Sequence, residues 1–428
     1  MNDFQTFCEN YLSGFTHQVG QRRSLGLEKE IILTDARGNM GNVVETMWPY
    51  FVKNGFTPEY DTYYKDEITG FNMKERAHIT TEAGKGTFEV ILDPIFGLNE
   101  CEAVMKRALR HCYKSIQSNP EARIVSLAYQ PLQPPLRENW NHKQRYEVLV
   151  DVLGQNVMTA TLSASDQVHV DIAREEFVPV TNLMSQLTGL FMVLFANSPI
   201  SEGKPAGEYV CREMIWDDLG TERTGVFDTP LTSAEDYLSR VWKLPCIMMK
   251  GGEKYYAPRK NFDELMKGKN GSEIFESFKL HEGAVWFCAR PRFFGTVEIR
   301  PTCLQPWDAM LSVPALMLGL IENWKNVEEF TKDLEWNEWI ALRKQASQEG
   351  FALKIKGKPV GLFLKELIDL AAEGLLKQGE PLTHLDPLYE RVNSGKNPHD
   401  RALDCFSSNG LPAVIDQNTL RPNHIDLP

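Results

Sequence analysis

The sequence has no excess of basic residues and no long hydrophobic run. Its 428 residues include 46 Lys and Arg against 58 Asp and Glu, which gives a net charge of -12. A groove for nucleic acid or an anionic membrane surface requires clustered positive charge, so neither is expected as a partner. The most apolar stretch, Leu187–Ala196, has ten residues, whereas roughly 20 are needed to cross a bilayer. We therefore expect no nucleic-acid binding and no membrane association.

Targeting signals and paired cysteines are also missing. The first residues, MNDFQTFCEN, carry acids and lack the basic and apolar regions of a signal peptide. The eight cysteines form no CxxC pair and are spread along the chain. This pattern favours free thiols in a reducing compartment over a disulfide framework or a zinc site. We expect a cytoplasmic protein of enzyme size, either a monomer or a homodimer.

Several common nucleotide-binding and catalytic motifs are absent. There is no GxxxxGK[ST] loop and no GxGxxG after a strand, so neither a P-loop nor a Rossmann site is indicated. The GxSxG and HExxH motifs of hydrolases are missing as well. The Gly251–Gly252 pair favours a turn between strands rather than a phosphate site. Histidines such as His78 and His142 have no ligand-like spacing and are interpreted as surface or structural residues.

The order of local patterns predicts a mixed α and β protein. We expect one helix from Asn99, with Glu102 completing a capping box, another from Ser233, and a third that ends at Gly379. Strand signals stop near Trp307, and helices dominate from there onward.

The two regions are not separated by a linker-like segment. We therefore expect a single domain over residues 1–428. Within it, a strand-rich catalytic body covers about 1–305 and a helical part covers about 306–428.

Four strand-like runs alternate an apolar face with a polar one. Residues two apart in a strand point to the same side of the sheet. Glu is disfavoured in strands, so a Glu-x-Glu pair within one needs a reason. The runs and their shared-face polar residues are Leu25–Leu33 with Glu28 and Glu30, Gly86–Leu92 with Thr87 and Glu89, Asp166–Ile172 with Gln167, His169 and Asp171, and Gly295–Thr302 with Glu298 and Arg300.

Spacing alone leaves two interpretations of this alternation open. An antiparallel sheet with one solvated face alternates in the same way. Alternatively, the polar faces line one cleft that pools carboxylates with an imidazole. Mg²⁺ takes oxygen ligands and leaves room for substrate phosphates, so such a cleft suits nucleotide chemistry. Arg300, two residues after Glu298, would then neutralise charge on a transferring phosphoryl group.

Five segments of the chain carry recognisable motifs. They are GLEKE at 26–30, TTEAGKGTFEV at 80–90, ANSPISEGKPAGEYVCREMIW at 196–216, ERTG at 222–225 and VEIRP at 297–301. The ANSP-x-x-EGKP-x-G stretch is the most specific of them. Together they resemble the glutamate–cysteine ligase family, in particular its plant-type branch with bacterial members. The resemblance implies an α+β fold similar to the catalytic domain of glutamine synthetase, a funnel of mainly antiparallel strands flanked by helices, with a helical C-terminal region.

The resemblance also implies a reaction and the residues that perform it. ATP would phosphorylate the γ-carboxylate of glutamate, and the amine of cysteine would capture the acyl phosphate, with two or three Mg²⁺ ions offsetting the negative charge. The implied catalytic residues are Arg300, Glu298 and His169, and the implied substrate contacts are Arg212, Trp216 and Arg223. The implied Mg²⁺ ligands are Glu28, Glu30, Glu82, Glu89 and Glu298.

The acceptor stays open because the chain departs from the family around the second substrate. It reads CREMIW where the family usually reads MRSHIW, and Pro245–Lys250 lacks the expected aromatic residues. Methionine-lined pockets are adaptable, so another amino acid or amine is an alternative acceptor. A ligand-binding relative without catalysis is a third hypothesis, which the intact Glu and Arg set disfavours.

Overall fold

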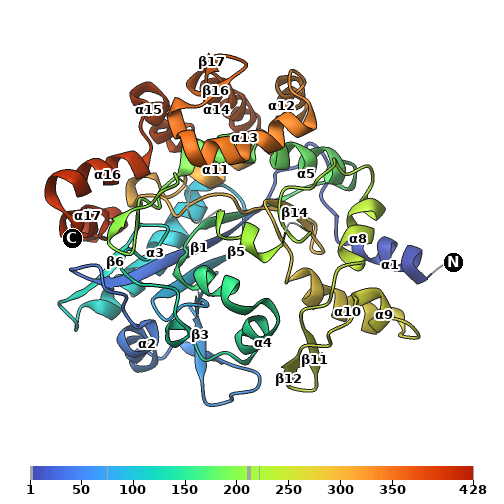
Figure 1. The fold of residues 1–428 in the computed structure, drawn as a ribbon, viewed down its shortest axis with the longest axis horizontal. Coiled ribbons are helices and arrows are strands. Elements are labelled where there is room, and N and C mark those ends of the chain that lie inside the picture. The colour runs from blue at the N-terminus through green and yellow to red at the C-terminus, as the bar shows by residue number, and fades with distance from the viewer. Residues whose placement is uncertain (1–2, 75, 210–213, 221, 428) are drawn as a thin grey trace.

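The computed structural model describes residues 3–74, 76–209, 214–220 and 222–427. In this part of the chain the centre is a nine-stranded sheet whose neighbouring strands all run antiparallel (Figure 1). The strand order is β14–β15–β7–β1–β5–β4–β3–β2, and β6 also pairs with β1. The strands are β1 (Leu25–Asp35), β2 (Thr57–Tyr60), β3 (Ile68–Asn72), β4 (Ala77–Thr81), β5 (Thr87–Ile95), β6 (Ala122–Val125), β7 (Asp166–Asp171), β14 (Ala289–Arg292) and β15 (Thr296–Ile299).

Helices pack against the apolar face of this sheet. α3 lies on β5, α5 lies on β14 and β15, and α11 lies on β7 and β1. The helices that precede the C-terminal region are α1 (Asp3–Leu12), α2 (Val43–Lys53), α3 (Leu98–Ile116), α4 (Gln144–Leu153), α5 (Phe177–Gln186), α6 (Thr188–Phe195), α8 (Ala234–Trp242), α9 (Phe262–Leu265) and α10 (Gly271–Glu282).

The C-terminal region is helical and packs on the rest of the chain through α6 and the sheet. Its helices are α11 (Ser312–Glu322), α12 (Trp324–Thr331), α13 (Trp336–Glu349), α14 (Val360–Gln378), α15 (Asp386–Ser394), α16 (Pro398–Asn409) and α17 (Leu411–Asn418). The region also holds a short hairpin of β16 (Lys354–Ile355) and β17 (Lys358–Pro359), so strands do not stop entirely at Trp307 as expected.

Three further short strand pairs lie outside the main sheet. They are β8 (Ile200–Ser201) with β9 (Lys204–Pro205), β10 (Thr224–Gly225) with β13 (Trp286–Phe287), and β11 (Met249–Gly251) with β12 (Lys254–Tyr256). The β10–β13 pair is parallel. The predicted α+β class, with mainly antiparallel strands flanked by helices, is confirmed.

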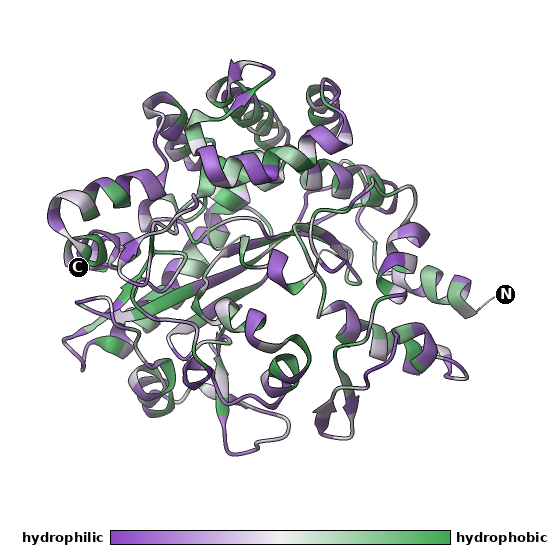
Figure 2. Ribbon diagram, in the orientation of Figure 1, coloured by the Kyte–Doolittle hydropathy of each residue, from purple (hydrophilic) through white to green (hydrophobic). Residues whose placement is uncertain are grey.

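Hydropathy follows the layers of the fold. Figure 2 shows hydrophobic residues along the central strands, whereas the surrounding helices alternate hydrophobic and hydrophilic residues. The buried apolar residues of the sheet and of the C-terminal helices belong to one hydrophobic core. That core fixes the apolar side of the sheet and leaves its polar side facing away from α3, α5 and α11.

All three predicted helix ends lie at or next to the expected residue, but the predicted capping box of one helix is wrong. Ser233 caps α8 by accepting from the N–H of Asp236 at 3.1 Å, and Gly379 ends α14 in the left-handed conformation at φ +69°. The helix expected from Asn99 instead begins at Leu98, after Gly97 at φ +96°. The Leu98 N–H donates to Glu380 Oε2 at 2.9 Å. A carboxylate from the distant C-terminal region therefore replaces the local capping box.

No single helix of the described chain has the length and hydrophobicity of a membrane span. The neighbouring helical segments Arg174–Gln186 and Thr188–Phe195, bent by 51° where they join, meet the criterion only when taken together.

A buried ion pair lies behind the polar face, on the helix-covered side of β1. Lys29 lies between Glu28 and Glu30 in the sequence, and its side chain therefore points to the opposite side of the strand. Its ammonium pairs with Asp166 of β7, and both side chains are fully buried. Asp166 also accepts from the Gln305 N–H at 3.1 Å. The pair joins β1, β7 and the segment before α11.

We predict that Lys29→Met destabilises the fold by about 3–5 kcal/mol, because it leaves the Asp166 carboxylate buried without its partner. The double variant Lys29→Met with Asp166→Leu should recover most of that loss, since neither charge remains in the core. Urea unfolding of the wild type and the two variants measures both effects. Equal stability of the wild type and the single variant would contradict the prediction.

Candidate active site

The polar side of the sheet lines a cavity of about 840 Å³. This volume lies within the range of about 300–1,000 Å³ typical of small-molecule sites. The strands that were predicted to alternate contribute to it together, so the interpretation as a solvated sheet face is not supported. The carboxylates that line the cavity are Glu28, Glu30, Glu59, Asp61, Glu82, Glu89 and Asp93.

Two of these carboxylates face each other across neighbouring strands. Glu30 of β1 and Glu89 of β5 are register partners, and both are buried. The Glu30 carboxylate accepts from Ser165 Oγ and from Gln167 Nε2, each at 2.7 Å. Burial raises the pKa of Glu89 well above its usual value, and the charges of Glu82, Glu28 and Glu30 raise it further. These four carboxylates therefore act on one another as a single negative cluster.

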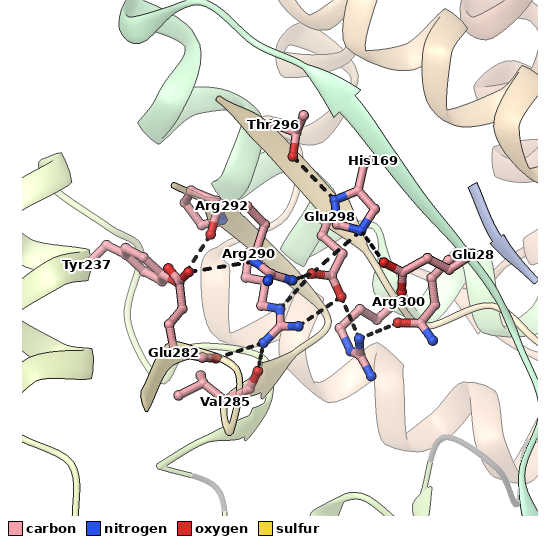
Figure 3. Close-up of polar contacts among 12 residues, drawn as sticks. Glu28, His169, Tyr237, Glu282, Val285, Arg290, Arg292, Thr296, Glu298 and Arg300 are labelled. Carbon is pink, nitrogen blue, oxygen red and sulfur yellow. Dashed lines mark hydrogen bonds and ion pairs between the residues drawn. The ribbon is translucent and has the colours of Figure 1, made fainter. Parts of the chain in front are cut away.

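Glu298 occupies a different environment at the β14–β15 end of the sheet (Figure 3). It is fully buried, and its carboxylate pairs with Arg290 at 2.9 Å and also with Arg292 and Arg300. Burial by itself would raise the pKa of Glu298, but Arg290, Arg292 and Arg300 hold it well below its usual range. Three guanidinium groups around one carboxylate repel a further cation. The geometry therefore favours an arginine-positioning role for Glu298 over the predicted role as a Mg²⁺ ligand.

A second buried carboxylate lies behind this arginine cluster. Glu282 accepts from the Tyr11 hydroxyl at 2.5 Å and the Tyr237 hydroxyl at 3.3 Å, and its Oε2 lies 3.6 Å from Arg292 Nε. Burial raises the pKa of Glu282, although Arg292 acts in the opposite direction. Glu282 thus restrains the side of Arg292 that does not face Glu298.

His169 joins the two groups of acids. Its Nε2 lies 3.2 Å from Glu28 Oε1 and 3.9 Å from Glu298 Oε2, and its Nδ1 lies 3.3 Å from Thr296 Oγ1. Burial raises the pKa of Glu28, but the hydrogen bond and charge of His169 lower it overall. The imidazole therefore positions Glu28 at the edge of the carboxylate cluster.

Cationic side chains line the same cavity as the acids. Arg300 and Arg290 reach it from the sheet, and Lys143 and Arg145 reach it from the start of α4. Lys143 is buried, donates to Thr80 Oγ1 at 3.1 Å and also bonds the Thr81 carbonyl. Burial, with help from the charge of Arg145, lowers the pKa of Lys143 to about 8. The cavity therefore has carboxylates that can bind a cation and cationic side chains that can bind a phosphate-like anion.

Aromatic and apolar side chains form the remaining wall. Trp216 lies 5.5 Å from the ring of Trp286, and the Arg300 guanidinium lies 5.9 Å from the Trp216 ring. Flat apolar surfaces of this kind suit stacking with a heterocyclic base or with an apolar ligand portion. Other lining residues of this kind include Tyr60, Ile91, Trp140, Tyr146, Leu149, Val157, Met248, Tyr255 and Leu280.

The donor set fits Mg²⁺ in its chemistry. Glu28, Glu30, Glu82 and Glu89 offer carboxylate oxygens, the ligands that this hard cation prefers. Burial is the main cause of the raised pKa of Glu89, and the charges of Glu82, Glu28 and Glu30 add to it; a divalent cation would offset these charges. Within the described ranges, no three His, Cys, Asp or Glu side chains already surround a common point as ligands do. The residues therefore match the ion by type and charge, without a preformed coordination shell.

The three predicted substrate contacts have different outcomes. Trp216 lines the cavity, and Arg212 lies outside the described residues. Arg223 is buried and donates to the carbonyls of Ala284 at 3.1 Å and Pro245 at 3.0 Å. It is not among the residues that line the cavity. The geometry gives Arg223 a structural role and does not support the predicted contact to substrate.

Several cavity residues were missed by the sequence interpretation. Arg290 and Arg292 lie two residues apart in a strand, as do the paired polar residues of the other strands. The same alternation could therefore have identified Arg290. Lys143 has no such signal, since it precedes a helix. His78 was interpreted as a surface or structural residue, but it lines the cavity, with Nδ1 2.8 Å from Glu59 Oε1 and Nε2 3.6 Å from Asp93 Oδ1.

Comparison with known proteins supports the same chemistry. The family model of Glutamate-cysteine ligase family 2 (GCS2) matches residues 24–422. A chloroplastic glutamate–cysteine ligase from Medicago truncatula is 24% identical over 377 residues, which cover 82% of this chain and 73% of the relative. Glutamate–cysteine ligase A from Oryza sativa subsp. indica, also chloroplastic, is 24% identical over 382 residues, covering 83% and 76%.

The fold resembles that of a solved glutamate–cysteine ligase. The crystal structure from Francisella tularensis, in complex with AMP, aligns with a TM-score of 0.61 at 11% identity and covers 95% of this chain and 88% of that one. At this identity the likeness concerns the fold alone.

The relatives correct the expected location. A cytoplasmic protein was predicted, but the curated relatives from Medicago, Oryza and Arabidopsis are all chloroplastic by name. The cytoplasmic prediction is therefore wrong by this comparison.

The lowered pKa of Lys143 predicts a pH dependence of stability. Between about 8 in the folded protein and the ordinary 10.5, the unfolded chain binds more protons at this amine, so stability rises with pH. In metal-free protein, the free energy of unfolding of the wild type relative to Lys143→Met should increase by about 1 kcal/mol per pH unit from pH 8 to 10. Urea unfolding of both proteins across this range measures it, and a constant difference would contradict it.

Proposed function

The chain belongs to the glutamate–cysteine ligase family 2 and is a carboxylate–amine ligase, and from this premise we propose how its cavity works. ATP transfers its γ-phosphoryl group to the γ-carboxylate of glutamate, and the amine of cysteine attacks the acyl phosphate, which releases phosphate and forms γ-glutamylcysteine. The observation that carries this proposal is the carboxylate cluster and the cationic side chains facing one cavity.

The acidic wall holds the metal ions in this proposal. Glu28, Glu30, Glu82 and Glu89 are the proposed Mg²⁺ ligands. Bound Mg²⁺ would offset the charge of the ATP phosphates and of the substrate carboxylate. Ser165 and Gln167 orient the Glu30 carboxylate through their hydrogen bonds, which reduces the freedom that it must lose on binding an ion.

The cationic wall acts on the phosphoryl group. Arg300 is held by Glu298 and by Gln167 Oε1, so its guanidinium is fixed before substrate arrives. Fixed donors aimed at developing charge are worth more in a buried site than in water. Lys143 and Arg145, on the other side of the cavity, would balance the remaining phosphate charge. No side-chain nucleophile is required, because the reaction depends on positioning and electrostatics.

The apolar wall receives the rest of the substrates. Trp216 lies next to Trp286 with its ring tilted and beside Arg300. It would cover the reacting groups and exclude water, which would otherwise hydrolyse the acyl phosphate. Met248 lines the same wall and can adapt to different apolar shapes. This feature favours, as a second candidate, the same chemistry with another amino acid or amine as acceptor.

We also propose that residues 1–428 work as a single domain. One hydrophobic core contains residues of the sheet and of the C-terminal helices. The bidentate pair of Arg343 on α13 with Asp217, at 2.7 and 2.8 Å, holds the segment that carries Trp216. The helical region would therefore contribute to the same active site.

Glu30→Gln is predicted to reduce ATP-dependent ligation by at least about 100-fold, because the amide cannot supply the carboxylate charge that a metal ion requires. Gln keeps the size of the side chain, so the fold should survive. The measurement is phosphate release with glutamate and cysteine at saturating Mg²⁺ and ATP.

Glu366→Gln serves as the matched control, since Glu366 is exposed on α14, far in sequence from the cavity residues. It should retain full activity. A folded Glu30→Gln protein with near-normal turnover would refute the assignment of Glu30 to the metal site.

The acceptor is tested by measuring phosphate release with ATP, glutamate and a panel of amines. Release that depends on cysteine supports γ-glutamylcysteine synthesis, and release with a different amine alone supports the second candidate. Mass spectrometry of the product identifies the bond formed. No phosphate release with any amine, in a protein that binds ATP, would contradict ligase activity of either kind.

A further inference from the structure

A second cavity, of about 600 Å³, lies between the start of the C-terminal region and its last helices. It shares no lining residue with the catalytic cavity. Its walls come from the turn at Trp307 and from α15, α16 and α17. The volume again falls in the range of about 300–1,000 Å³ expected for small-molecule sites. The proposed ligase reaction makes no use of this cavity.

Arg391 of α15 is the buried charge of this cavity, with 3% of its surface exposed. Its Nη1 donates to Gln305 Oε1 at 2.7 Å and to the Leu194 carbonyl at 3.1 Å. Gln305 is itself fixed, because its amide donates to the carbonyls of Phe195 and Cys303. The guanidinium therefore has a defined position, with neutral groups as its hydrogen-bond acceptors.

Other buried arginines of the described chain have a carboxylate at ion-pair distance. Arg23 pairs with Glu176 at 2.7 Å, Arg290 with Glu298 at 2.9 Å, Arg343 with Asp217 at 2.7 Å and Arg223 with Glu222 at 3.5 Å. Among the described residues Arg391 has no such partner. Burial, together with the charge of Arg401, lowers the pKa of Arg391 to about 9. The charges of Asp308 and Glu390 act on Arg391 from beyond ion-pair distance and oppose this shift. A buried guanidinium without a carboxylate in direct contact is costly, and an anion bound in the cavity would relieve that cost.

The rim of the cavity carries the opposite charge. Asp308 and Asp386 line it and are exposed, and neither forms an ion pair within the described residues. Arg401 also lines the cavity, but it already pairs with Glu390. The charges left without partners are thus one buried guanidinium and two carboxylates at the rim.

We propose that this cavity binds a free α-amino acid, with the ligand carboxylate on Arg391 and its ammonium on Asp308. The carboxylates at the rim would repel a polyanion, and the Arg391 guanidinium would repel a simple cation. A zwitterion satisfies both ends of the cavity with one molecule. The fixed position of Arg391 favours binding because little side-chain order is lost when the ligand arrives.

The test is isothermal titration calorimetry of the full chain, without ATP, with each standard amino acid except the proposed substrates glutamate and cysteine. We expect at least one to bind with a stoichiometry of one. Its binding should weaken at least tenfold in Arg391→Gln and in Asp308→Asn. The corresponding carboxylic acid without the amine, and the amine without the carboxylate, should each bind at least tenfold more weakly.

Glu30→Gln, in the catalytic cavity, is the matched control and should bind the amino acid as the wild type does. Asp308 is exposed, so its variant tests the site even if Arg391→Gln fails to fold. The proposal is overturned if no amino acid binds, if Asp308→Asn binds as tightly as the wild type, or if Glu30→Gln abolishes binding.

Discussion

Repulsion among carboxylates on one face of a single sheet is the constraint on which the rest of the structure depends. Buried like charges raise each other's pKa unless opposite charge lies near, and Glu89 shows this among its acidic neighbours. The chain supplies the opposite charge from two directions. Three arginines surround Glu298 at one end of the sheet, and Lys143 with Arg145 approaches from α4. The remaining negative charge around Glu89 is what the proposed Mg²⁺ ions would offset.

The shared polar faces were predictable because strand geometry is local. Glu28 and Glu30 share a face through the two-residue period alone. Their partners across the sheet depend on register, which the spacing within one strand does not encode, and Glu82 was assigned only through the family resemblance. The cap of α3 was mispredicted for a related reason, since its first N–H bonds to Glu380, far along the chain. Arg223 was assigned from its motif, yet its buried neighbours are backbone carbonyls. The sequence thus showed which polar residues share one face of a strand. The contacts that determine their roles come from segments far away in the sequence.

The C-terminal helices take part in shaping the catalytic cavity as well as in stabilising the fold. Arg343 on α13 holds Asp217, the residue after Trp216. On the other side of residues 210–213, the Tyr209 N–H donates to the Ser347 carbonyl at 2.7 Å. α13 therefore bonds to the chain at Tyr209 and again at Asp217, next to Trp216. Because α13 also packs on α6, the position of Trp216 depends on the packing of the core.

Lys29 lies at one end of a continuous series of contacts that reaches the second cavity. Its ammonium pairs with Asp166, which accepts from the Gln305 N–H, and the Gln305 side chain accepts from Arg391. Contacts alone transmit no energy between sites; an element must exist in two arrangements that both sites bias. Gln305 donates to Asp166 of β7 through its backbone N–H and accepts from Arg391 through its side-chain oxygen. A ligand that moves the Arg391 guanidinium would therefore act on Gln305 first, and on the strand that carries Glu28 and Glu30 only through Asp166. Since Asp166 and Lys29 are fully buried, any displacement there must be concerted, because neither charge can separate from the other without a large desolvation penalty.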